Sequence, residues 1–207
     1  MTWRMDWRRI GYNDRVVVVG TTGAGKSTLL RAMGQSRPWV LLYDPKGEWE
    51  GEEWLTVREA AKLPRKPHPR IRYFPLPEEL RDKEAIDAFF WWAYYAKNLT
   101  VVVDEAYLAT LAGAWLPPGY QACLAQGRSR NVAVWTATQR PYKIPQTILS
   151  EAEHWFIFRL NAPQDRWAVH QWTGIDPNLM APENLPKRLW YYVSEGQVYG
   201  PYELKME

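Results

Sequence analysis

The chain is 207 residues long, with a formal net charge of +3 and a single cysteine. Its 46% hydrophobic and 24% charged residues are the proportions of an ordinary globular protein, which excludes a disordered or fibrous chain. We expect no signal peptide, no transmembrane segment and no internal disulfide, because the sequence has no long apolar run, no apolar stretch at its N-terminus and no second cysteine. The length predicts one domain over residues 1–207, with a core at about 15–160 and a C-terminal helix and hairpin at 163–204.

A short valine strand runs directly into a glycine-rich loop near the N-terminus. Residues 16–19 are consecutive valines without polar alternation, as expected of a parallel strand that is covered on both faces. Residues 20–27 read GTTGAGKS and fit G-x-x-x-x-G-K-[ST], the phosphate-binding P-loop. Residues 28–33 are predicted to be a helix. Strand, loop and helix therefore follow one another in the order that this motif requires.

The P-loop predicts a binding site for ATP. Glycines at positions 20, 23 and 25 permit positive φ angles and let backbone N–H groups approach the phosphates closely. Lys26 is expected to reach the β- and γ-phosphates, and the Ser27 hydroxyl is expected to ligate Mg²⁺. The predicted nucleotide-binding residues are Gly20, Thr22, Gly23, Ala24, Gly25, Lys26, Ser27 and Thr28.

Three further strands are predicted before and after the P-loop unit. Residues 3–10 and 70–74 are predicted to form short strands, and residues 39–43 form a buried one. The last of these ends in DPKGE (44–48), which is either part of a ligand site or an ordinary turn, because ligands bind at the C-terminal ends of parallel strands. The basic, proline-broken run 62–72 is either a solvated loop or a loop that faces nucleic-acid phosphates.

The rest of the chain alternates predicted helices and strands. Residues 82–97 predict a helix whose aromatic centre, 89–95, should be buried in the core or in a subunit interface. Residues 188–193 and 197–202 predict a hairpin around Glu195-Gly196. Further strands are predicted at 99–103, 132–138 and 154–160, and further helices at 107–114, 120–127, 146–151 and 163–173.

Polar residues after two of these strands can supply the chemistry of ATP hydrolysis, which needs a metal, an oriented water and positive charge. Asp104 follows the strand 99–103 and can hold Mg²⁺, while Glu105 can polarise the attacking water. The alternative for both is capping of the next helix. Gln139, after the strand 132–138, is either a γ-phosphate sensor or a turn residue.

Arg128 and Arg130 lie in the polar turn GRSRN (127–131). Either they are a solvated pair, or one of them is an arginine finger that completes the site of a neighbouring subunit, which requires a ring. No nucleophile motif such as G-x-S-x-G is present. The sequence therefore favours nucleotide hydrolysis over nucleophilic catalysis by a side chain.

Four stretches together resemble the FtsK–HerA superfamily of DNA-pumping ATPases. They are GTTGAGKST (20–28), YDPKGE (43–48), VVVDEA (101–106) and GRSRNVAVWTATQRP (127–141). The last is the most specific, because it looks like the family's arginine-finger segment followed by its ATQRP strand end. The resemblance implies Arg128 as the trans-acting arginine and Gln139 as the γ-phosphate sensor. It also implies the usual roles for Lys26, Ser27, Asp104 and Glu105.

The resemblance implies an α/β fold of the RecA-like, additional-strand, catalytic-glutamate class of P-loop NTPases. Its mainly parallel sheet would have the order 5-1-4-3-2, with an extra strand between the two strands that end in acidic motifs, flanking helices and a C-terminal β-hairpin. It further implies a homo-oligomeric ring, usually a hexamer, with double-stranded DNA in its channel. ATP and Mg²⁺ are the implied cofactors.

The chain lacks room for the membrane region, winged-helix module or N-terminal barrel of larger family members, so it looks most like the genome-packaging ATPases of tailless icosahedral viruses with an internal membrane. This resemblance implies a motor that pumps DNA into a preformed capsid, in the host cytoplasm and at a virion vertex, with a capsid or membrane-associated viral protein as partner. The alternatives are a conjugation or filamentous-phage assembly ATPase and a nucleotide-gated structural subunit with little turnover. A nucleotide kinase would fit the P-loop but not ATQRP.

Overall fold

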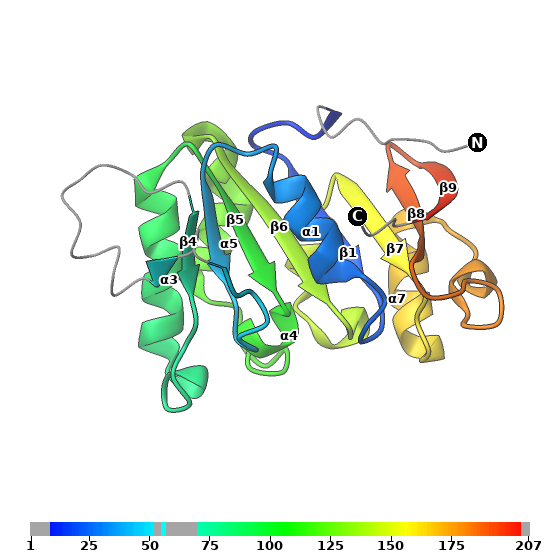
Figure 1. The fold of residues 1–207 in the computed structure, drawn as a ribbon, viewed down its shortest axis with the longest axis horizontal. Coiled ribbons are helices and arrows are strands. Elements are labelled where there is room, and N and C mark those ends of the chain that lie inside the picture. The colour runs from blue at the N-terminus through cyan, green and yellow to red at the C-terminus, as the bar shows by residue number, and fades with distance from the viewer. Residues whose placement is uncertain (1–8, 52–54, 57–69, 204–207) are drawn as a thin grey trace.

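The computed structural model describes residues 9–51, 55–56 and 70–203, whose strands form one nine-stranded sheet (Figure 1). The strands are β1 (Arg15–Val19), β2 (Val40–Tyr43), β3 (Leu55–Thr56), β4 (Arg70–Tyr73), β5 (Leu99–Asp104), β6 (Val132–Thr138), β7 (His154–Phe158), β8 (Leu189–Ser194) and β9 (Gln197–Glu203). The strand predicted at 3–10 and the basic run at 62–72 lie largely outside the described residues. No helix in the described ranges is both long and apolar enough to cross a bilayer.

The strand order confirms the predicted topology. The sheet runs β3-β4-β2-β5-β6-β1-β7-β8-β9, and its part β7-β1-β6-β5-β2 is the predicted order 5-1-4-3-2. Pairs from β3 to β7 are parallel, while β8 and β9 are antiparallel. The predicted place of the extra strand is wrong, because β2 and β5 are neighbours and β6 instead lies between β1 and β5. The end of β6 therefore lies between the P-loop and the acidic pair.

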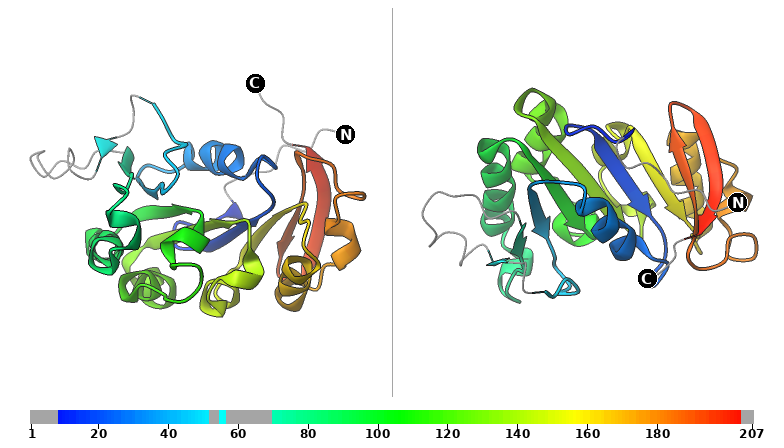
Figure 2. Two further views of the ribbon diagram at one scale, coloured as in Figure 1. Left: turned by 90° about the horizontal axis from the view of Figure 1, so that it is seen from below. Right: turned by 45° about the horizontal axis from the view of Figure 1, so that its top comes forward.

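Helices cover both faces of the sheet. Helix α1 (Lys26–Gly34) lies on one face, and α3 (Lys83–Ala96), α5 (Pro118–Gln126) and α7 (Pro163–Thr173) lie on the other (Figure 2). Successive side chains of β1 point to opposite faces of the sheet. Val16 and Val18 belong to the hydrophobic cluster under α1, and residues 17 and 19 belong to the larger hydrophobic cluster on the other face. The unbroken valine run therefore reflects burial on both sides.

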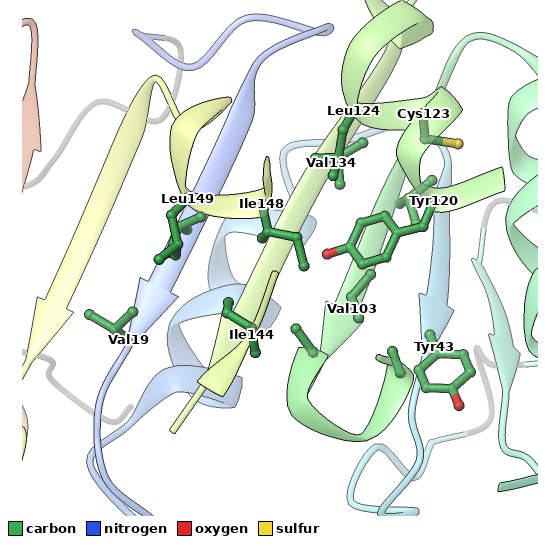
Figure 3. Close-up of a cluster of buried hydrophobic side chains, with 14 of the residues drawn as sticks. Val19, Tyr43, Val103, Tyr120, Cys123, Leu124, Val134, Ile144, Ile148 and Leu149 are labelled. Carbon is green, nitrogen blue, oxygen red and sulfur yellow. The ribbon is translucent and has the colours of Figure 1, made fainter. Parts of the chain in front are cut away.

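The larger cluster packs α5 and α6 (Gln146–Ser150) onto the central strands. Figure 3 shows the ring of Tyr120 and the side chain of Ile148 on the same side of the sheet as Val103 and Val134. Tyr120 stacks on Phe90 of α3, with ring centroids 4.4 Å apart. These contacts tie α3 and α5 to the strands that end at the acidic and sensor residues.

The single cysteine, Cys123, lies inside this cluster and is fully buried. Its thiol donates to the carbonyl of Phe90 over 3.5 Å. Burial raises the pKa of the Cys123 thiol to about 12, because the low-dielectric interior disfavours the thiolate. The thiol therefore behaves as a packing group rather than as a nucleophile.

Two predicted helices differ from the structure. The helix predicted at 107–114 is wrong beyond its first turn, because α4 (Ala106–Ala109) is followed by positive φ angles from residue 111 to 113. A Cβ on Gly113 would lie 2.2 Å from the carbonyl oxygen of Lys143, so the close approach requires glycine. The aromatic centre of α3 is only partly buried, since Trp92 is 38% and Tyr95 is 65% exposed.

The C-terminal hairpin is confirmed. β8 and β9 pair antiparallel around Glu195 and Gly196, which have φ angles of 51° and 72°. Positive φ at both turn residues is the geometry of a two-residue hairpin that matches strand twist. Short 3-10 helices complete the described structure at Glu79–Arg81, Gly127–Arg130, Pro141–Lys143 and Pro177–Met180.

Replacing Gly119 by alanine is expected to lower the free energy of unfolding by about 1–3 kcal/mol. A Cβ there would lie 2.7 Å from the backbone nitrogen of Trp91, so α5 and α3 would have to separate. Gly34→Ala in α1 is the matched control, because its Cβ would meet no atom within 4 Å and alanine favours helix by up to about 1 kcal/mol. Urea unfolding of both variants measures the difference. Equal loss in both would contradict the close packing of the two helices.

Candidate functional site

The carboxyl ends of β1, β5 and β6 meet at one edge of the sheet, where a cleft of about 240 Å³ opens. Parallel neighbours necessarily end on the same side, so the segments that follow them converge. The cleft is lined by residues of the P-loop and the start of α1, of the end of β5, of the segments after β2 and β6, and of the segment before β8: Thr22, Gly23, Gly25, Lys26, Ser27, Thr28, Lys46, Glu48, Asp104, Gln139 and Arg188.

The P-loop backbone has the conformation that its glycines predict. Gly23 and Gly25 have φ angles of 68° and 115°, and Gly25 is the N-cap of α1. The first N–H groups of a helix have no partner within it, so α1 offers donors for phosphate at the cleft. Gly20 and Ala24 do not line the cleft. A Cβ on Gly20 would lie 2.6 Å from that of Phe158, and Ala24 is 1% exposed and donates to a loop carbonyl, so both shape the loop from inside.

The Lys26 ammonium lies against the loop itself. Nζ donates to the carbonyl oxygens of Gly20 at 2.8 Å and Thr21 at 3.1 Å. Burial lowers the pKa of Lys26 to about 8, because a charged amine loses its hydration there, although the carboxylate of Glu105 partly opposes the shift. A phosphate that replaced these two carbonyls as hydrogen-bond acceptor would favour the charged form of Lys26.

Nucleotide affinity is expected to fall as the pH rises above about 8. Below that pH Lys26 is already protonated, whereas above it the amine must take up a proton when the phosphates raise its pKa. Linkage predicts about a tenfold loss of affinity per pH unit between the two pKa values. Calorimetric titration at pH 9 in two buffers of different ionisation enthalpy measures the proton uptake, with pH 7 as the control. Binding at pH 9 without proton uptake would contradict the lowered pKa.

Asp104 and Ser27 form a pair of oxygen ligands beside the loop. The Ser27 hydroxyl donates to Oδ2 of Asp104 at 2.9 Å, and the indole N–H of Trp49 donates to the same oxygen. Asp104 is 4% exposed, so its charge is directed at the cleft rather than at bulk water. A hydroxyl and a carboxylate at hydrogen-bond distance are hard oxygen donors of the kind that Mg²⁺ takes alongside substrate phosphates, so the residues present fit this ion.

Glu105 is held by three donors from two neighbouring segments. Oε1 accepts from the Thr138 hydroxyl and from the backbone N–H of Gln139, both at 3.2 Å. Oε2 accepts from Lys46 Nζ at 2.9 Å. The residue has φ 94° and ψ 77°, a conformation that a non-glycine residue adopts only when its surroundings impose it. The alternative role of helix capping is not seen for Glu105, since its side chain caps no backbone N–H of α4.

Gln139 reaches the P-loop from the end of β6. Its Oε1 accepts from the Thr22 hydroxyl at 2.6 Å, so the strand end and the loop are in direct contact. The next residue, Arg140, donates to the buried carboxylate of Asp165 in α7 at 3.0 Å, and the same carboxylate accepts from the N–H of Tyr142. This anchor fixes the chain that carries Gln139.

The structure does not bring Arg128 to this cleft. Arg128 precedes β6 and Gln139 follows it, so the seven residues of the strand separate them by roughly 23 Å at about 3.3 Å per residue. Arg128 is exposed and forms an ion pair with Glu153. Arg130, by contrast, lies over the ring of Tyr94, with 4.0 Å from its guanidinium carbon to the ring centroid.

Five residues at the site were given no role by sequence reasoning: Lys46, Glu48, Trp49, Thr138 and Arg188. Lys46 lies in YDPKGE, one of the four stretches that resemble the FtsK–HerA superfamily, but the sequence predicted no role for this lysine. Thr138 lies in ATQRP, one residue before Gln139. Arg188 reaches the cleft because β8 runs antiparallel to β7 and therefore begins where β7 ends, and no local pattern marks it.

Comparisons with known proteins agree with these features. The chain is 27% identical over 184 residues to DNA packaging ATPase P9 of Enterobacteria phage PRD1, covering 83% of this chain and 76% of that protein. It is 25% identical over 197 residues to Protein P9 of Pseudoalteromonas phage PM2, covering 89% and 87%. No protein-family model matches the chain.

Solved structures show the same fold. Genome packaging NTPase B204 of Sulfolobus turreted icosahedral virus 2, in complex with AMP, superposes with a TM-score of 0.74 and 14% identity over 95% of this chain and 100% of that chain. VirB4 of Thermoanaerobacter pseudethanolicus superposes with a TM-score of 0.63 and 12% identity over 98% and 93%. The resemblance predicted from the sequence is thereby confirmed: the chain is similar in sequence to a DNA packaging ATPase of a phage, and similar in fold to genome packaging NTPase B204 and to VirB4.

Proposed function

We propose that this protein is an ATPase whose cleft binds ATP at Lys26, Ser27 and the start of α1. The observation that carries the proposal is the convergence of the P-loop, Asp104, Glu105 and Gln139 from separate elements at one sheet edge. Relatives that are named ATPases support it. A fold alone would not, because P-loop folds serve many chemistries.

In this proposal each side chain has one task. Lys26 leaves the loop carbonyls for the β- and γ-phosphates, and Ser27 and Asp104 hold Mg²⁺. The ion, when bound, neutralises charge on the phosphates. Glu105 orients a water and accepts its proton, since its carboxylate is buried and fixed by β6. Gln139 contacts the γ-phosphate. When this phosphate leaves after hydrolysis, the side-chain amide of Gln139 returns to its hydrogen bond with Thr22.

We further propose that hydrolysis drives translocation of double-stranded DNA into a viral capsid. The named packaging function of the PRD1 relative supports this role. The position of Arg128 supports a homo-oligomeric ring, such as a hexamer, because an arginine finger so far from its own cleft would act on a neighbour. A capsid vertex or a membrane-associated viral protein would be the docking partner. Residues 1–207 would form one ATPase domain, as the continuous sheet supports.

Steady-state ATP hydrolysis with and without linear double-stranded DNA, over a range of protein concentrations, tests the proposal. A ring motor with shared sites predicts turnover that rises cooperatively with concentration and increases with DNA. Turnover that is linear in protein and indifferent to DNA would leave an ATPase and overturn the translocase. Binding of ATP without turnover under every condition would favour the structural-subunit alternative.

A further inference from the structure

One loop supplies a contact to each of the two acidic residues at the cleft. Lys46 Nζ lies 2.9 Å from Oε2 of Glu105, and the Trp49 indole donates to Asp104. The Lys46 side chain is 27% exposed and also lines the cleft, whereas that of Glu105 is only 5% exposed. Lys46 therefore touches both the buried carboxylate and the space that the phosphates would enter.

The fold places this loop through a buried carboxylate. Asp44 is fully buried and accepts from the backbone N–H groups of Glu48 at 3.2 Å and Trp49 at 3.0 Å. Arg72 of β4 lies 3.7 Å from the same carboxylate, and the N–H of Asp44 donates to the carbonyl of Tyr73. These contacts hold the backbone of the turn against the sheet, so Lys46 lies close to Glu105.

The hydrogen bond from Lys46 to Glu105 interferes with the proposed role of Glu105 as a general base. Oε1 of Glu105 is already taken by Thr138 and by the N–H of Gln139, so Oε2 is the oxygen that could accept from an attacking water. Lys46 occupies that oxygen. The ammonium holds an acceptor site of Oε2, so it competes with water for that oxygen. Movement of Lys46 would leave both acceptor sites of Oε2 open to water.

We propose that Lys46 is a second phosphate-binding lysine, which leaves Glu105 for the terminal phosphate of a nucleoside triphosphate. This inference rests on the proposed ATPase function. A flexible four-carbon stem with three donors can swing between two anions on either side of it. The γ-phosphate carries more negative charge than one carboxylate, so it competes successfully. A diphosphate lacks that group and leaves Lys46 on Glu105.

The exchange gives the site a means of distinguishing ATP from ADP before hydrolysis. Triphosphate binding draws Lys46 away and frees Oε2 for water, and loss of the γ-phosphate returns it. Lys46 thus touches substrate in one position and restrains the base in the other.

Binding of AMPPCP and ADP, each with Mg²⁺, to the full chain tests this exchange. Lys46→Met is expected to weaken AMPPCP about tenfold or more, as for a lost hydrogen bond between charged groups, and to change ADP by less than about twofold. Lys46→Arg is expected to restore the preference. Lys187→Met, which removes the same charge from an exposed position that does not line the cleft, is the control and should leave both affinities unchanged.

A double-mutant cycle tests the link to Glu105. Glu105→Gln is expected to tighten AMPPCP binding, because Lys46 then gives up no ion pair when it moves to the γ-phosphate. This gain in affinity should vanish in the double variant Lys46→Met/Glu105→Gln. Equal weakening of AMPPCP and ADP in Lys46→Met, or additive effects in the cycle, would overturn the exchange while leaving the ATPase intact. Failure of the unmodified protein to bind either nucleotide would instead overturn the proposed function on which the exchange rests.

Discussion

Replacing Glu105 by glutamine is expected to lower kcat for ATP hydrolysis by about 100- to 10,000-fold, the range lost when a general base is removed. Glutamine retains the acceptor for Thr138 and for the N–H of Gln139, so the end of β6 keeps its place. The amide cannot take a proton from water. ATP binding should therefore survive, and phosphate release measured beside fluorescent-nucleotide binding separates the two effects.

Glu151→Gln provides the matched control for this change. Glu151 is an exposed carboxylate at the C-cap of α6 and does not line the cleft. Its neutralisation should leave kcat within about twofold, as expected of a surface substitution. Normal turnover in Glu105→Gln would remove Glu105 from the role of base. Loss of ATP binding together with turnover would point instead to collapse of the acidic pair.

Replacing Arg128 by alanine is expected to lower kcat by about 1,000- to 100,000-fold, the range attributed to an arginine finger. The loss should be complemented between subunits, because Arg128 lies at the far end of β6 from its own P-loop. In a mixture with Glu105→Gln subunits, an Arg128→Ala subunit keeps its own base and receives Arg128 from its neighbour. Turnover measured as a function of mixing ratio should therefore pass through a maximum.

Arg130→Ala is the control for the finger. Arg130 lies two residues away in the same 3-10 helix but packs over Tyr94, so its loss should spare most turnover. The ion pair of Arg128 with Glu153 is exposed, and breaking it should cost only about 0–1 kcal/mol of stability. A flat, inactive mixing curve would contradict action in trans.

The sequence predicted the sheet well because its central strands are buried on both faces. Each such strand is a short apolar run, and the segments that follow parallel neighbours lie at the same sheet edge. Lys26, Ser27, Asp104 and Gln139 could be placed together from that rule alone. The extra strand was misplaced, since strand adjacency depends on long-range pairing that no local pattern records.

The remaining parts of the site depend on contacts between distant segments. Lys46 and Glu105 are 59 residues apart in the chain, and the pairing of β2 with β5 and the turn closed by Asp44 bring them together. Arg188 arrives through the reversal of β8. The helix predicted after Glu105 failed because its alanines and leucines favour helix locally, while Gly113 must fit against the backbone of Lys143.

The inert thiol of Cys123 makes the natural chain a suitable background for site-directed labelling. With no second cysteine in the sequence and this one buried at a raised pKa, maleimide chemistry near neutral pH has no competing native target. A cysteine introduced at an exposed position, such as Trp167 on α7, would carry a dye without any prior removal of native residues. Fluorescence from such a dye could count subunits by stepwise photobleaching.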